Sequence, residues 1–91
     1  MRVDVSKFGA SLLSRPAGRE AALALQANVL RGVGTEELIE IDFSKVLVLT
    51  PSWADEFVSV LREQYGVRVK LLPEGNASVR LTLEAIQESV T

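Results

Sequence analysis

Apolar and polar residues alternate along three short stretches of the chain, and this period predicts β-strands that bury one face. The three stretches are residues 2–6, 39–43 and 67–71. The acids Glu40 and Asp42 of the second stretch predict that one face of the sheet is open to solvent or that these acids lie near a strand end. A continuous apolar run at 46–49 follows, and we expect it to be deeply buried.

Three further stretches carry apolar residues three and four positions apart, which predicts helices. The first helix is expected to start at Pro16, because a proline at the first helical position lacks only an N–H that would have no partner there. The second has Thr50 as its cap, Pro51 as its first residue and the most regular apolar stripe of the chain. Asn76 is expected to cap the third helix.

The resulting order of strand, helix, strand, helix, strand, helix is typical of an α/β domain with a mostly parallel sheet. We expect a single domain over residues 1–91, built as a small sandwich of three or four strands with three helices. Residues 7–15 are expected to form a connector that packs against the domain, because Phe8, Leu12 and Leu13 are too apolar for a free loop.

The composition excludes several classes of function. Hydrophobic residues make up 47% of the chain and charged residues 24%, which is ordinary for a globular domain. The net charge is −2 and the 10 lysines and arginines are spread along the chain, so nucleic acid is not expected as a partner. The absence of cysteine and histidine excludes a disulfide framework, a zinc–thiolate site and a Ser-His-Asp hydrolase within the chain. We therefore expect no catalytic residue, no metal and no cofactor.

The chain also lacks the sequence signs of a membrane protein. No apolar run approaches the ~18 residues of a transmembrane helix. The first residues do not have the apolar segment of a signal peptide. We expect a cytoplasmic protein without a membrane partner.

Hydroxyl and carboxylate side chains gather where the second strand leads into the second helix, a place where open α/β sheets bind ligands. Ser52 is either a phosphoacceptor and contact residue or a second capping hydroxyl paired with Asp55. Thr50 is a helix cap or a phosphoacceptor. Asp55 and Glu56 are expected to stabilise the first turn through the helix dipole, and a catalytic pair is disfavoured because adjacent residues do not share a helix face.

Four more residues are candidates beside this cluster. Asp42 orients the loop, binds a cation or Arg15, or hydrogen-bonds a turn at the end of its strand. Trp53 is either an exposed interface anchor or a cover for the end of the core. Ser14 and Arg15 are expected at the mouth of the first helix, because Pro16 disfavours a helical conformation at Arg15. Arg15 then binds an anion, pairs with Asp42 or is an ordinary surface residue.

The run IDFSKVLVLTPSWADEF resembles the central signature of STAS-like domains, the relatives of bacterial anti-sigma factor antagonists and of the cytoplasmic domain of sulfate transporters. Asp42-Phe43 matches the end of a strand, and Thr50-Pro51-Ser52-Trp53 falls on the Asp-Ser-Ser-Gly that opens a helix. A narrower STAS-like family of unassigned function is more similar still, since Phe8–Arg15, Ile41–Phe43 and Thr50–Phe57 resemble its motifs in order. The resemblance covers about residues 3–90 and implies the STAS-like sandwich.

The resemblance implies a non-enzymatic regulatory module for protein–protein interaction in bacterial signalling and transcription regulation. In that class, a partner kinase with a GHKL-type ATP-binding fold phosphorylates a serine at the start of the central helix, and the added dianion breaks the complex. Pro51 falls on the usual acceptor position, which leaves Ser52 and Thr50 as phosphoacceptor candidates. The partner-binding residues implied here are Ser14, Arg15, Asp42, Thr50, Ser52, Trp53, Asp55 and Glu56.

Two hypotheses from other classes remain open. In the first, the chain is a small-anion or nucleotide-binding sensor whose pocket is the N-terminus of the second helix together with Arg15. Asp55 and Glu56 would repel an anion there, and no glycine allows a phosphate to approach closely. In the second, the short edge strand Val3–Val5 pairs with a second copy, so the chain is expected to be a monomer or a weak homodimer.

Overall fold

Strands and helices follow one another along the chain as the apolar pattern predicts, except that two strands precede each of the first two helices. The computed structural model describes the backbone of residues 1–90 and the side chains of residues 1–86. The strands are β1 (Arg2–Asp4), β2 (Ser11–Leu12), β3 (Ile39–Asp42), β4 (Val48–Leu49) and β5 (Val69–Leu71). The helices are α1 (Arg15–Asn28), α2 (Pro51–Tyr65) and α3 (Ala77–Val90), and short 3₁₀ turns lie at Val5–Phe8, Leu30–Gly32 and Gly66–Arg68. The predicted α/β class with three helices is confirmed.

The strands divide into two small parallel sheets. The larger has the order β1-β3-β5, in which Val3 lies opposite Ile41 and Ile39 lies opposite Val69. The smaller consists of β2 and β4, with Leu12 opposite Leu49. β2 lies inside the segment that the sequence predicts as a connector, and it is too short for an alternating pattern to reveal it.

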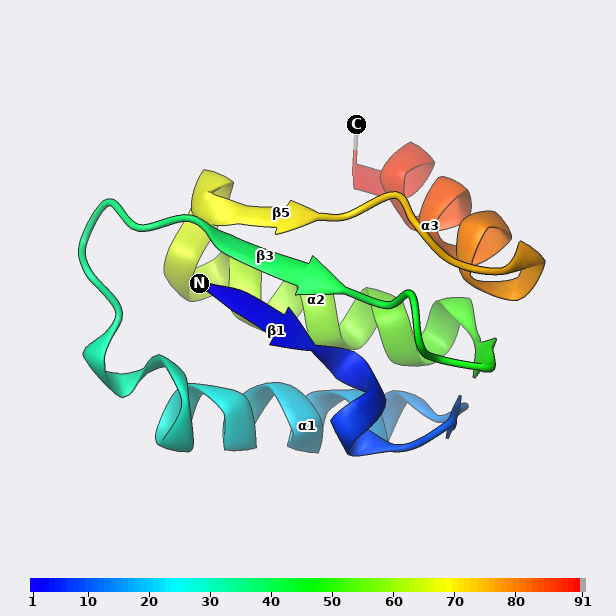
Figure 1. Cartoon of the computed structure of the whole chain (residues 1–91), viewed down its shortest axis with the longest axis horizontal. Helices are drawn as coiled ribbons and strands as arrows, with labels where there is room; N and C mark the ends of the chain where they lie inside the picture. The colour runs from blue at the N-terminus through cyan, green and yellow to red at the C-terminus, as the bar shows by residue number, and fades with distance from the viewer. Residues whose placement is uncertain (91) are drawn as a thin grey trace.

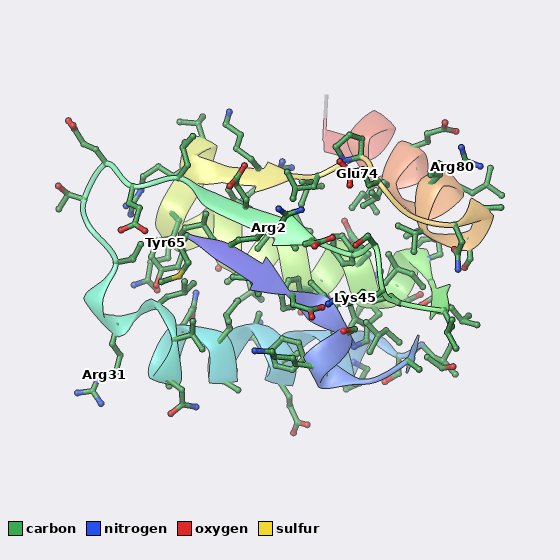
Figure 2. The ribbon with its side chains drawn as sticks, in the orientation of Figure 1. Arg2, Arg31, Lys45, Tyr65, Glu74 and Arg80 are labelled. Carbon is green, nitrogen blue, oxygen red and sulfur yellow. The ribbon has the colours of Figure 1, made fainter. Side chains whose placement is uncertain are left out.

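One face of the larger sheet is packed and the other is open. The side chains of Val3, Ile39, Ile41 and Val69 are buried. In Figure 1, α2 runs behind the three strands and α1 lies along their lower edge, so the strands face the viewer uncovered. Arg2, Glu40 and Lys70 are aligned across the three strands on that open face, and Figure 2 shows Arg2 there. One face of the sheet is therefore solvated, and Asp42 also lies at the end of its strand, so both predicted explanations of these acids hold.

The apolar run at 46–49 is only half buried, contrary to the prediction. Val46 and Leu49 belong to the core, whereas Leu47 is 64% exposed and Val48 is 43% exposed. A turn closed by Val46 N–H and the Phe43 carbonyl (3.0 Å) leads into β4, whose side chains then alternate between the core and solvent. A run of apolar residues cannot by itself distinguish a strand covered on both faces from a strand covered on one.

Several element boundaries differ from the prediction because of local contacts. α1 starts at Arg15, one residue before Pro16, because the Ser14 hydroxyl accepts a hydrogen bond from Ala17 N–H and caps the helix there. The strand predicted at 67–71 starts at Val69, and Val67 lies in a 3₁₀ turn, where the residue is 85% exposed. Asp4 accepts from Ser6 N–H, which ends β1 and starts the 3₁₀ turn that follows.

The core lies between the larger sheet and the helices. The predicted stripe of α2 is buried along its whole length, from Ala54 to Tyr65. Within the part of the chain that the structure describes, no helix is both long and apolar enough to cross a membrane.

Candidate functional site

Thr50 joins the start of α2 to the segment between β2 and α1. Its hydroxyl accepts a hydrogen bond from Trp53 N–H (3.3 Å) and donates to the Leu13 carbonyl (2.7 Å). Its backbone N–H donates to the Leu12 carbonyl (3.1 Å). The capping interpretation of Thr50 is confirmed, and both the proton and an acceptor lone pair of the hydroxyl are already in use.

Ser52 lies on the first turn of α2 with its side chain exposed. Its hydroxyl makes no hydrogen bond with any residue that the structure describes, and Asp55 is directed elsewhere, so the predicted capping pair of Ser52 and Asp55 is wrong. The cap is Thr50, and the helix needs no second one. Ser52 borders a shallow depression whose other walls are Arg15, Pro51, Asp55 and two residues of α3, Ala85 and Ile86.

Arg15 is held by two carboxylates of α2. Its Nη1 lies 3.0 Å from Asp55 Oδ2 and 3.1 Å from Glu56 Oε2. These hydrogen bonds, first that to Asp55 and then that to Glu56, raise the pKa of the Arg15 guanidinium. The alternative in which Arg15 pairs with Asp42 is therefore wrong.

The positions of Asp55 and Glu56 also differ from the prediction. α2 begins at Pro51 and has no acid in its first turn, so neither carboxylate acts there on the helix dipole. Although they are adjacent in sequence, both reach the same guanidinium across the α1–α2 contact. Arg19 adds a second cation, with its Nη1 3.6 Å from Glu56 Oε1.

Asp42 lies apart from this cluster, at the carboxyl end of β3. Its Oδ1 accepts from Ser44 N–H (2.9 Å), and its Oδ2 lies 3.4 Å from Arg2 Nε. Burial alone would raise the pKa of Asp42, but the hydrogen bonds from Ser44 and the charge of Arg2 outweigh burial and lower it. Asp42 thus takes the predicted role in a turn. No group of three or more metal-ligating residues occurs in the described part of the chain.

Trp53 covers the end of the core. Only 1% of its surface is exposed, and its ring stacks on Phe57 with 4.7 Å between ring centroids and 20° between planes. The alternative of an exposed anchor for a partner is wrong, because the side chain faces inward from the third position of α2.

The structure brings together six of the eight predicted residues: Ser14, Arg15, Thr50, Ser52, Asp55 and Glu56. The sequence reasoning missed Arg19, although its spacing of four residues from Arg15 places both on one helix face. It also missed Ala85 of α3, whose position beside Ser52 depends on how α3 packs and leaves no sign in the sequence.

A family model described as "STAS-like domain of unknown function (DUF4325)" matches residues 24–90. The chain belongs to this STAS-like family. No curated protein and no solved structure matches it. The STAS-like match includes Asp42 and all of α2, but it begins after the segment Phe8–Arg15, so the resemblance of that segment to a family motif stays a prediction.

Proposed function

We propose that this STAS-like protein is a non-enzymatic regulatory module that binds a protein partner through the start of α2 and the adjoining Ser14 and Arg15. The proposal rests on the position of Ser52. This serine is exposed on the first turn of a capped helix and lies at the rim of a depression. A serine in this place is the feature shared with anti-sigma factor antagonists, which the sequence resembles.

The proposal favours Ser52 over Thr50 as the phosphoacceptor. A phosphate on Thr50 would remove the donor to the Leu13 carbonyl and disturb the cap, which typically contributes ~1 kcal/mol to stability. Ser52 would lose no hydrogen bond to a described residue. The γ-phosphoryl group of ATP would pass to Ser52 Oγ with release of ADP and the hydroxyl proton, and a GHKL-type kinase is the proposed donor enzyme.

A phosphate on Ser52 would act on the surface around it in two ways. The positive end of the α2 dipole and the nearby guanidinium of Arg15 would attract it. Asp55 and Glu56, which hold Arg15 in the unmodified protein, would repel it. Phosphoserine would therefore compete with these carboxylates for Arg15, and a partner that fits the unmodified surface would lose affinity.

The anion-sensor hypothesis has less support from the same contacts. Arg15 is already neutralised by two carboxylates. Among the first three residues of α2, Pro51 has no N–H and the Trp53 N–H is bound to Thr50, so only the Ser52 N–H is free to meet an anion. Helix N-termini that bind phosphate usually present several free N–H groups.

The test uses the purified chain, a GHKL-type ATP-binding protein from the same source, and Mg-ATP. We expect the intact mass to rise by one phosphate, and Ser52→Ala to abolish the gain while Ser59→Ala, an exposed serine of the same helix, leaves it unchanged. Ser52→Asp should weaken the complex in a titration. A complex that is unaffected by every change at Ser52 would show that the start of α2 is not the interface.

A further inference from the structure

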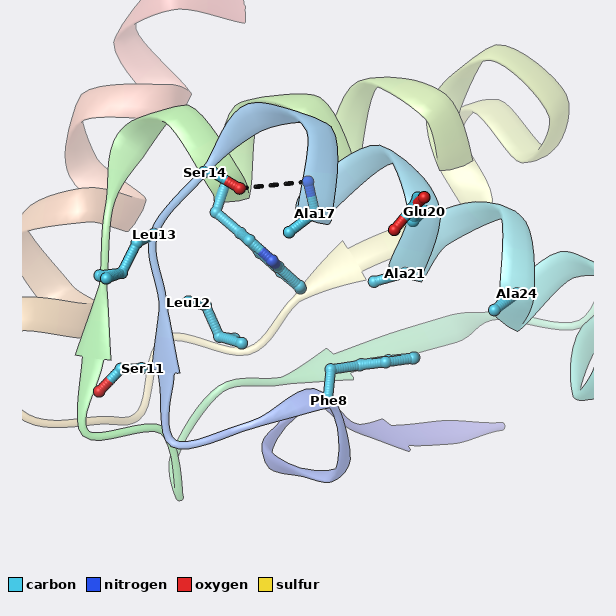
Figure 3. A pocket seen from close by; sticks show the side chains of 10 residues that line it. Phe8, Ser11, Leu12, Leu13, Ser14, Ala17, Glu20, Ala21 and Ala24 are labelled. Carbon is cyan, nitrogen blue, oxygen red and sulfur yellow. Dashed lines mark hydrogen bonds between the residues drawn. The ribbon is translucent and has the colours of Figure 1, made fainter.

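A second concave surface, the β2–α1 groove, lies away from Ser52 and Arg15. It encloses about 420 Å³, and most of its lining is apolar, from Phe8, Leu12, Ala17, Ala21, Ala24 and Trp53. Figure 3 shows it between β2 with the preceding turn on one side and α1 on the other. Neither Ser52 nor Arg15 lines it. Of these apolar residues, Ala24 and Trp53 lie within the segment that the STAS-like model matches, and the other four precede it.

One wall of the groove is the free edge of β2. On its other edge, the Ala10 carbonyl accepts from Val48 N–H (3.0 Å) and the Leu12 carbonyl accepts from Thr50 N–H (3.1 Å). Alternate residues of a strand direct their backbone groups to opposite edges, so Ser11 directs its N–H and carbonyl away from β4. Leu13 follows the strand, and its carbonyl is bonded to the Thr50 hydroxyl. Among the described strands, β4 is the only neighbour of β2.

The lining residues confirm that the groove follows this edge. Ser11, Leu12 and Leu13 all border it, although consecutive side chains of a strand point to opposite faces. No described residue of β4 borders it. This combination arises when a groove runs along the backbone edge of a strand rather than over one face of the sheet.

The opposite wall and the rim determine which ligand fits. The alanines at 17, 21 and 24 leave space beside α1, and Leu13 is 56% exposed at the end of the groove. Glu20 is the only charged residue among those that line it, and its carboxylate forms no ion pair with the residues that the structure describes. The groove thus combines unpaired backbone groups, apolar walls and one unmatched negative charge.

We propose that the β2–α1 groove binds an extended peptide segment of a protein partner, which adds as a strand to the free edge of β2. Strand addition pairs backbone groups along a sheet edge and places alternate side chains in pockets. The peptide would bring apolar side chains at every second position and a lysine or arginine opposite Glu20. A helical ligand is disfavoured because its backbone groups are paired internally and cannot meet those of Ser11. This site shares Ser14 with the surface proposed at the start of α2 but includes neither Ser52 nor Arg15.

The test selects, from a displayed library of random short peptides, those that bind the full chain. Peptides that also bind the variant Ala24→Lys are removed, because the lysine fills the groove from an exposed position of α1. The matched control is Ala27→Lys, an exposed alanine of the same helix outside the groove. We expect enriched peptides with alternating apolar residues and a lysine or arginine. They should bind the control like the wild type and bind Ala24→Lys at least about tenfold more weakly. Glu20→Lys should change the preferred charge to aspartate or glutamate.

Two further measurements test strand addition itself. Amide NMR signals of Ser11 and Leu13 should shift when an enriched peptide binds, and methylation of alternate backbone nitrogens of the peptide should abolish binding. The proposal is overturned if no peptide enriches on the wild type over Ala24→Lys, or if the methylated peptide binds equally well. It is also overturned if these amide signals shift with protein concentration alone, since the occupant would then be a second copy of the chain. Circular dichroism of Ala24→Lys and Ala27→Lys checks that both are folded.

Discussion

At the scale of single residues, Thr50 connects three parts of the fold through one side chain. Its hydroxyl caps α2 and donates to the Leu13 carbonyl. Leu13 lies between β2 and α1, so this one side chain links all three elements. We expect Thr50→Ala to lower the free energy of unfolding by about 1–2 kcal/mol, because the cap and one further hydrogen bond are lost. Thr50→Ser, which keeps the hydroxyl, should recover most of it. Urea denaturation measures both, and equal midpoints for Thr50→Ala and the wild type would contradict the capping role.

Asp42 predicts a pH dependence of stability at the same scale. Its pKa is lower in the folded chain than in the unfolded chain, where an aspartate titrates near ~3.9. The stabilisation is therefore present above that value and is lost as the pH falls through the lower, folded pKa. We expect Asp42→Asn to be less stable than the wild type at neutral pH and the difference to shrink below about pH 4.

Urea denaturation over a series of pH values would measure this difference. The matched control is Glu40→Gln, an acid of the same strand whose carboxylate makes no hydrogen bond or ion pair with the described residues. A stability difference for Asp42→Asn that is constant from neutral to acid pH would show that its ionised carboxylate is not what stabilises the turn.

At the scale of elements, α1 and α2 pack closely because of Gly18. A Cβ at this position would collide with the backbone carbonyl oxygen of Trp53. Backbone cannot move aside as a flexible side chain can, so Gly18→Ala should force the two helices apart. We expect a loss of about 1–3 kcal/mol from overpacking, despite the better helix propensity of alanine.

The control for Gly18 is Gly32→Ala, where an added Cβ meets no atom within 4 Å. Thermal or urea unfolding of the two variants gives the comparison. Because the helix contact also positions Arg15 against Asp55 and Glu56, Gly18→Ala should weaken partner binding at the start of α2 as well. A Gly18→Ala variant as stable as Gly32→Ala would contradict the close approach of the helices.

At the scale of the whole molecule, the open face of the larger sheet carries charges instead of a covering layer. Arg2, Glu40 and Lys70 lie side by side across its three strands, and their charges keep this open face from forming an exposed apolar patch. We expect the double change Glu40→Val and Lys70→Val to create an apolar patch and to raise the mass observed in sedimentation velocity as concentration increases. Glu63→Val, at an exposed position of α2, is the control. A double variant whose observed mass matches that of the wild type at every concentration would show that these charges do not control self-association.

The local features of the fold could be predicted from the sequence because each depends on a few neighbouring residues. The caps at Thr50 and Asn76 are confirmed, the latter by a hydrogen bond from Val79 N–H to the Asn76 side chain (3.0 Å). The alternating period at 39–43 marks a strand, and the stripe of α2 marks its buried face. These signals require only that one side of an element meets the core.

Tertiary structure decided what the residues of the site do. Arg15 pairs with Asp55 and Glu56 because Gly18 lets α1 lie close to α2, and nothing in the sequence distinguishes those acids from Asp42 as partners. Trp53 is buried because Phe57 and the core lie on its side of the helix. β2 forms only because β4 lies beside it, since two residues have no strand pattern of their own. The sequence by itself determined the three helices, the strands β1, β3 and β5 and their order, because periodicity and capping are local, while contacts between elements distant in sequence determined β2 and the site.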